Sequence, residues 1–235
     1  MRSLDAPSTI DELYRDRGAV EITVPLAQGD VFDRIEVPSL GTGPRTVQVV
    51  MHPCSLRQGA TLRKLITVAP VRKVGGAANE GTWGTKYFNH MLLPGLRDDT
   101  VFYVADFREV APVKSEQLVL NSRIAALSGG GTALLQQRMI FALTRLVVER
   151  TQLAVAAAPV LTELELQESW CEIAVEASPS VDPDKALSES ITDFHAWLDQ
   201  DSKAHRRLLQ DVSRHAQLRR DTMREARIRY ANRKQ

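Results

Sequence analysis

The sequence has little cysteine and no long apolar run. Its two cysteines, Cys54 and Cys171, lie far apart among 235 residues, which excludes the disulfide framework of a small secreted domain and fits a reducing compartment. The most apolar stretch, residues 153–161, contains Pro159 and is far shorter than the roughly 20 residues of a membrane span. No secretory leader follows Met1. We therefore expect a soluble, cytoplasmic chain with no membrane partner.

Sequence motifs for common cofactors are also missing. We find no dinucleotide-binding glycine fingerprint and no helical metalloprotease motif. Gly129–Gly131 precedes a predicted helix, where small residues can hold an anion, but the Lys-Ser or Lys-Thr of a phosphate loop does not follow. We interpret these glycines as a flexible hinge. We expect no bound cofactor and no metal.

Charge of both signs is present but unevenly distributed. The formal net charge is +1, yet residues 202–235 carry eleven Lys or Arg against three acidic residues, so the rest of the chain is acidic. A basic segment on an acidic body can bind a polyanion or fold back onto that body.

The first part of the sequence predicts strands. Short runs rich in Val, Ile, Thr and Phe are separated by Gly and Pro, without helical periodicity, which is typical of a small antiparallel β-barrel. A short helix over residues 8–17 precedes them. The predicted strands cover residues 19–25, 30–37, 46–52, 62–71, 87–93 and 100–110.

The second part predicts helices, so the expected fold class is α+β, with an SH3-like barrel followed by a helical C-terminal half. We predict a barrel domain over 1–112, a helical domain over 113–200 and a basic helical tail over 201–235. The apolar residues of the helix at 133–148 cover much of its circumference, which favours a central position. The predicted helices cover residues 116–127, 133–148, 161–177, 184–198 and 201 onward.

The predicted barrel region resembles the PemK/MazF family of bacterial RNA-cleaving toxins over residues 28–112. Gln28-Gly29-Asp30-Val31 resembles the opening strand of the family, and residues 43–50 (GPRTVQVV) resemble its Gly-x-Arg-Pro-x-x-Val strand, although Thr46 replaces the proline. Residues 65–71 (LITVAPV) and 100–110 (TVFYVADFREV) resemble two later strands.

The resemblance implies an SH3-like barrel and possible roles in RNA cleavage. Arg45 matches the family's catalytic arginine, while Arg72 stands near the position where the family has a Thr or Ser. Arg45 and Arg72 would then stabilise the charge that develops on phosphorus, and His52 would be the acid–base candidate. A toxin–antitoxin, mobile-element or phage-defence context would follow by association.

His52-Pro53-Cys54 is a second candidate site. Pro53 favours an extended His52, and residues two apart in an extended segment point to the same side. A neighbouring imidazole can activate a thiol, or the pair can supply two zinc ligands with others from His90, Cys171 or a carboxylate. Alternatively, Cys54 packs as a small apolar residue and His52 holds a turn.

The basic tail is the third candidate, because its arginines recur at helical spacing and would follow the phosphates of a nucleic acid. The alternative is a solvated helix, or one docked through its few apolar residues. The nucleic-acid-binding candidates are Arg206, Arg207, Arg214, Arg220, Arg224 and Arg227.

Two further groups have local explanations. Aromatic residues around residues 83–90 lie near Lys86 and Arg97 and can stack bases or form core. Asp106 and Arg108 are spaced for an internal ion pair.

The function that these patterns favour is nucleic-acid binding by a barrel and a basic tail. The alternatives are a Cys/His-centred enzyme, redox or metal protein at His52 and Cys54, and a non-catalytic subunit whose helical half binds a protein partner. Whether the chain is an enzyme is left open by its sequence.

Overall fold

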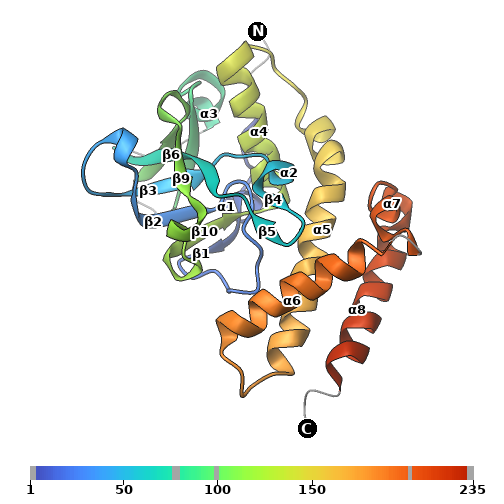
Figure 1. Ribbon diagram of the computed structural model, residues 1–235. Helices are drawn as coiled ribbons and strands as arrows, with labels where there is room; N and C mark the ends of the chain where they lie inside the picture. The colour runs from blue at the N-terminus through green and yellow to red at the C-terminus, as the bar shows by residue number, and fades with distance from the viewer. Residues whose placement is uncertain (1–3, 76–79, 98–100, 201–202, 232–235) are drawn as a thin grey trace. The chain divides into compact units, whose positions relative to one another are not determined.

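The computed structural model describes residues 4–75, 80–97, 101–200 and 203–231. As expected, the fold is α+β, with an antiparallel sheet in the N-terminal half and helices in the C-terminal half (Figure 1). The chain forms two compact units. The first unit contains residues 1–20, 26–56 and 62–157, and the second contains residues 21–25, 57–61 and 158–235.

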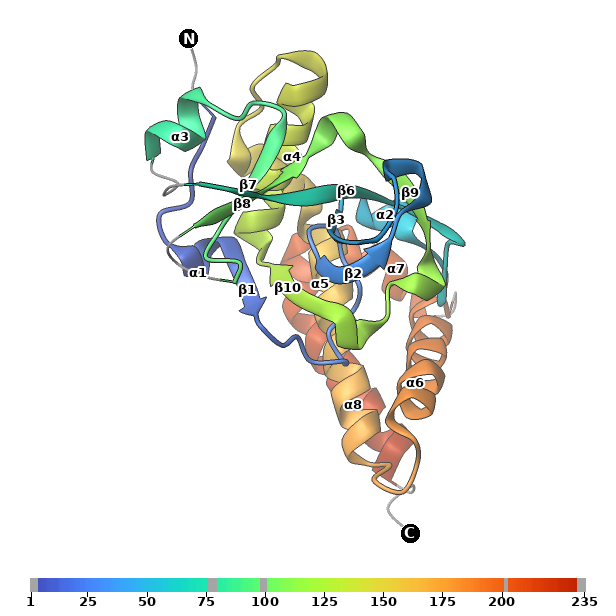
Figure 2. The same cartoon turned by 90° about the vertical axis from the view of Figure 1, so that its left-hand side faces the viewer.

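Within the described residues, eight strands form one antiparallel sheet in the order β1-β10-β2-β3-β6-β8-β7, with β9 also paired to β6 (Figure 2). A separate hairpin follows α2 (Pro53–Leu56). Its strands, β4 (Arg57–Gln58) and β5 (Thr61–Leu62), have two residues each. The strands of the main sheet are β1 (Tyr14–Arg17), β2 (Val31–Glu36), β3 (Pro44–Val49), β6 (Leu65–Val74), β7 (His90–Pro94), β8 (Phe102–Asp106), β9 (Ala111–Lys114) and β10 (Arg123–Leu127).

Alternation along the strands divides the apolar side chains of the first unit between two cores. In β6, Ile66 and Val68 belong to one core and Ala69 to the other, because successive side chains of a strand point to opposite faces. The same change occurs between Val31 and Phe32 in β2. The core that contains Val31 also receives Leu134 and Leu135 of α4 (Gly129–Thr144).

Only part of α4 is central to the fold. Leu134 and Leu135 are fully buried, whereas Leu143, nearer the end of the helix, is 79% exposed. The following residue Leu146 is also exposed. The predicted central position is therefore confirmed for the N-terminal turns of the helix and wrong for its C-terminal end.

The glycines before the predicted helix are part of α4, so the hinge prediction is wrong. The helix begins at Gly129, and the Ser128 hydroxyl accepts a hydrogen bond from Gly131 N. A Cβ atom at Gly131 would lie 2.0 Å from the Leu13 carbonyl oxygen. The glycine therefore permits close packing of α4 against the end of α1 (Ile10–Leu13).

The second unit is built from helices around an aromatic core. α5 (Arg150–Glu176) begins in the first unit and continues through the second with Pro159 inside it. Trp170, Phe194, Trp197 and Tyr230 are each at most 1% exposed, and Trp170 has ring contacts with the other three. The other helices of this unit are α6 (Pro183–Leu198), α7 (His205–Leu209) and α8 (His215–Ala231).

Three predictions of local structure are wrong. Residues 116–127 form short turns followed by β10, because that segment pairs with both β1 and β2. Residues 8–17 form α1 and then β1 rather than one helix. Residues 19–25 form no strand. The predicted start of the basic helix at residue 201 lies outside the described residues, and the helix itself is divided into α7 and α8.

Among the described residues, none of the helices combines the length and the apolar character that crossing a membrane requires.

Candidate functional site

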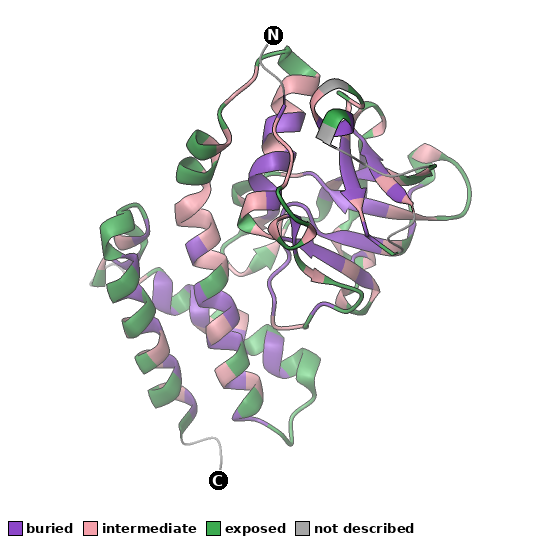
Figure 3. Cartoon of the chain, turned by 180° about the vertical axis from the view of Figure 1, so that it is seen from behind, coloured by how far each residue is buried: buried purple, intermediate pink, exposed green. Residues whose placement is uncertain are grey.

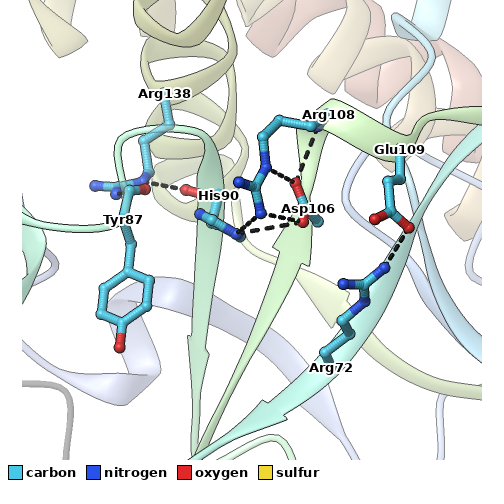
Figure 4. Close-up of polar contacts among 7 residues, drawn as sticks. All are labelled: Arg72, Tyr87, His90, Asp106, Arg108, Glu109 and Arg138. Carbon is cyan, nitrogen blue, oxygen red and sulfur yellow. Dashed lines mark hydrogen bonds and ion pairs between the residues drawn. The ribbon is translucent and has the colours of Figure 1, made fainter.

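A group of ionisable side chains in the first unit lies where β7 and β8 pair (Figure 4). His90 opens β7 and is directly opposite Asp106, the last residue of β8, in the antiparallel register. Arg108 follows in the 3-10 turn at Phe107–Glu109. Strand pairing therefore brings together residues that are sixteen or more positions apart in the chain.

Asp106 is the buried anion of this group. Its side chain is 1% exposed, and Arg108 donates to both carboxylate oxygens, from Nε to Oδ1 at 2.9 Å and from Nη2 to Oδ2 at 2.7 Å. The hydrogen bond from Arg108 lowers the pKa of Asp106 to about 2. Asp106 is therefore ionised at neutral pH, and the predicted Asp106–Arg108 ion pair is confirmed.

His90 completes the group as a neutral ring. Its Nε2 lies 3.5 Å from Asp106 Oδ2 and 3.4 Å from Arg108 Nη2. Burial lowers the pKa of His90, with the cations Arg108 and Arg138 acting in the same direction and the Asp106 carboxylate opposing them. Its Nδ1 is buried and makes no hydrogen bond to any residue that the structure describes.

Arg138 of α4 fixes the segment that carries His90. Its guanidinium is fully buried and lies over the Trp83 ring at 5.3 Å from the ring centre. It donates to four main-chain carbonyls, and burial lowers its pKa to about 10. The acceptors are His90 O at 2.6 Å, Tyr87 O at 2.8 Å, Trp83 O at 3.0 Å and Lys86 O at 3.4 Å.

These contacts favour a structural role for the cluster. A general base needs an accessible nitrogen within hydrogen-bonding reach of a substrate proton. In His90 the Nε2 atom faces Asp106 and Arg108, and the Nδ1 atom is buried. The cluster therefore orders the ends of β7 and β8, while Arg108, 59% exposed, is the member that solvent reaches.

The residues that the resemblance connects with RNA cleavage make no direct contact with one another, although Arg45 and Arg72 lie on adjacent strands, each two residues beyond the paired Val47 and Pro70. Arg72 of β6 pairs with Glu109, as Figure 4 shows. Arg45 of β3 is half-buried, and its guanidinium lies against Gly41. Among the residues described, no hydrogen bond or ion pair joins Arg45, His52 and Arg72 to one another.

His52 and Cys54 are in direct contact, but through the main chain. The Cys54 amide donates to His52 Nδ1 at 3.3 Å, and Cys54 lies in α2, which begins at the intervening Pro53. The Cys54 thiol is free and exposed. This contact fits the turn-holding alternative for His52, whereas the alternative of a buried Cys54 is wrong.

The basic tail is anchored in the second unit by one face of α8. Leu218, Thr222, Ala226 and Tyr230 follow one another at four-residue intervals and are at most 1% exposed. Leu218, Ala226 and Tyr230 belong to the aromatic core, and the Tyr230 hydroxyl donates to Asp193 of α6 at 2.8 Å. α8 is therefore a packed helix with a defined outer face.

Three of the predicted arginines lie on that outer face. Arg220, Arg224 and Arg227 are exposed and are spaced by four and three residues, which places them on one side of a helix. In Figure 3, α8 is the helix that leads to the C-terminus, and exposed residues run along its length. Arg224 pairs with Asp221 at 2.7 Å. Within the described part of the chain, Arg220 and Arg227 have no ion-pair partner.

The other predicted arginines differ in their pairing. Arg206 of α7 is held by Glu163 of α5, at 3.0 Å, and by Asp199. Arg214 lies 3.9 Å from Asp211. Arg207 is exposed and forms no ion pair with any described residue. The six candidates therefore divide into cations that are bound within the unit and cations that face solvent.

No three or more His, Cys, Asp or Glu side chains of the described residues are grouped so that they could hold a metal ion. No protein-family model matches the sequence, and no curated protein matches it significantly.

Proposed function

We propose that this protein binds nucleic acid through its phosphate backbone, using the exposed face of α8. The observation that carries the proposal is the row formed by Arg220, Arg224 and Arg227, opposite the buried face of the same helix. Arginines in a row neutralise successive phosphates and release their counterions, which supplies most of the free energy of non-specific binding.

The packing of α8 supports this use of its arginines. Leu218 and Tyr230 pack the opposite side of the helix into the core. The helix that carries the row is therefore ordered before a ligand binds, and binding costs little conformational entropy of the helix. Arg207 of α7 is a further exposed cation of the same unit. Arg206 contributes less to the proposed interface, since Glu163 and Asp199 already neutralise it. For the same reason Arg224, paired with Asp221, contributes less than Arg220 and Arg227.

The resemblance to PemK/MazF barrels adds a proposal for the first unit. We place this chain with toxin–antitoxin, mobile-element or phage-defence proteins of bacteria on that resemblance alone. Because no hydrogen bond or ion pair links Arg45, His52 and Arg72 among the described residues, we propose binding as the activity and do not propose a cleavage step.

The test is a salt titration of nucleic-acid binding by the full chain and by the triple variant R220Q/R224Q/R227Q. Each phosphate contact contributes about 0.9 to the slope of log K against log salt on a duplex. We expect the triple substitution to weaken binding at low salt and to reduce the slope by about 2 to 3.

The control is Lys185→Gln, which removes an exposed cation from α6 in the same unit. Its binding and slope should match those of the unchanged protein. If the triple variant and the control bind equally well, the arginine row is not the interface. The exposed substitutions should change the free energy of unfolding by less than about 1 kcal/mol, so lost binding would not reflect lost folding.

A further inference from the structure

We infer that the ligand of α8 is a nucleic-acid duplex rather than a single strand. This inference rests on the proposed function and specifies its substrate class. It follows from which side chains accompany the arginine row, from the rigidity of the helix and from the charge density of the two kinds of ligand.

The first step concerns stacking. Proteins that bind single strands combine cations with aromatic side chains on which successive bases stack. The other exposed residues of α8 are Ala216, Gln217, Arg219, Ile228 and Ala231, none of them aromatic. The four large aromatic side chains described in this unit, Trp170, Phe194, Trp197 and Tyr230, are all at most 1% exposed. The described part of the second unit therefore offers phosphate contacts without a stacking surface.

The second step concerns geometry. Arg227 lies seven positions after Arg220, so the row extends about 10 Å along the helix axis. Packing in the aromatic core and the Tyr230–Asp193 hydrogen bond fix the position of this helix in the second unit. The phosphates of a duplex have fixed positions that a rigid row of arginines can match. A single strand must first adopt one conformation before its phosphates can match the row.

The third step concerns charge density. A duplex carries about one negative charge per 1.7 Å of its axis, and each neutralised phosphate contributes about 0.9 to the salt slope, compared with about 0.7 for a single strand. When contact is made only through phosphates, the duplex therefore releases more counterions for the same three cations. The same row should bind the duplex more tightly at low salt.

The experiment compares a short DNA duplex, each of its separated strands, and heparin as a polyanion without base pairs. The full chain, the triple variant R220Q/R224Q/R227Q and the Lys185→Gln control are titrated at several salt concentrations. We expect the duplex to bind about tenfold or more tighter than either strand at low salt. The triple variant should lose this preference and the control should keep it.

The outcomes distinguish the preference for a duplex from the proposed binding of nucleic acid by α8. If a single strand or heparin binds as tightly as the duplex, and the triple variant weakens both, the duplex inference is wrong while the proposed function stands. If none of the probes binds at low salt, the proposed function itself is wrong. Near-ultraviolet circular dichroism of each variant verifies that the aromatic core of the second unit is intact.

Discussion

Arg138 is a buried cation whose charge is balanced by main-chain dipoles. It donates to the carbonyls of Trp83, Lys86, Tyr87 and His90, and no carboxylate of the described residues pairs with it. Tyr87 has a φ of 54°, in the left-handed region that is unfavourable for a bulky residue. A single side chain of α4 thus stabilises the segment that leads into β7, including Tyr87 in its unfavourable backbone conformation.

Replacing Arg138 by Met should destabilise the first unit by about 3 kcal/mol or more. Met fills much of the same space but leaves buried carbonyls without donors, each of which carries a desolvation penalty of about 1–3 kcal/mol. Equilibrium unfolding in denaturant measures this change. Arg145→Met is the matched control, because Arg145 is an exposed residue that follows the same helix. Equal stability of the two variants would contradict the assigned role of Arg138.

The residues of the β7–β8 cluster differ in how well the sequence predicted them. Asp106 and Arg108 are two positions apart, so their ion pair could be inferred from local spacing. His90 joins them only because β7 pairs with β8 in a register that places it opposite Asp106. Local sequence does not determine that register. Arg138 was missed because its partners are main-chain carbonyls, which have no residue-type signature.

At the scale of the elements, the strands with runs of β-branched residues were predicted well. Strands whose residues have a high helix propensity were not. β2, β3 and β6 are rich in Val and Ile and lie close to their predicted ranges. β10 has the sequence RIAAL, whose alanines and leucine favour a helix. Its pairing with β1 and β2 overrides that preference. Pairing between distant segments is the information that local propensity lacks.

α8 depends on its buried face, and Leu218→Ala tests this dependence. Leu218 is fully buried in the aromatic core, so its truncation should lower the free energy of unfolding by about 3 kcal/mol. Ile228→Ala on the same helix is the control, because Ile228 is 63% exposed and its loss should change stability by less than about 0.5 kcal/mol. Tryptophan fluorescence during denaturation reports both, since Trp170 and Trp197 lie in the same core. Equal effects of the two substitutions would contradict the packing of α8.

At the scale of the molecule, the second unit contains a buried histidine whose pKa is lower in the folded than in the unfolded chain. His195 of α6 is 5% exposed, and its Nδ1 lies 3.9 Å from Glu163 Oε1. Burial lowers the pKa of His195 to about 4, and the charges of Arg57 and Arg206 act in the same direction. The unfolded chain therefore binds a proton at this residue at a higher pH than the folded chain does.

The second unit should lose stability as the pH falls from about 6.5 to about 4. Across this range the unfolded state gains a proton on His195 that the folded state excludes, so the loss attributable to this residue approaches about 3 kcal/mol. Well above pH 6.5 the residue is neutral in both states and its contribution is constant.

The measurement is the free energy of unfolding at several pH values for the unchanged protein and for His195→Gln. The difference between the two should change across the range from pH 6.5 to pH 4 and be constant above it. A difference that is independent of pH would show that His195 titrates normally in the folded protein. The comparison also separates His195 from His90, whose pKa is lowered too and which is common to both proteins.

The close approach of Gly131 to Leu13 has a consequence for how the sequence can vary. A Cβ atom at residue 131 would meet the Leu13 carbonyl oxygen at 2.0 Å, and one at Gly130 would lie 3.1 Å from the Glu12 oxygen, whereas Gly59 and Gly75 face open space. Among descendants of this sequence that keep the fold, residue 131 should stay glycine. The neighbouring glycine should tolerate little beyond alanine, and the open position at residue 75 should accumulate substitutions freely.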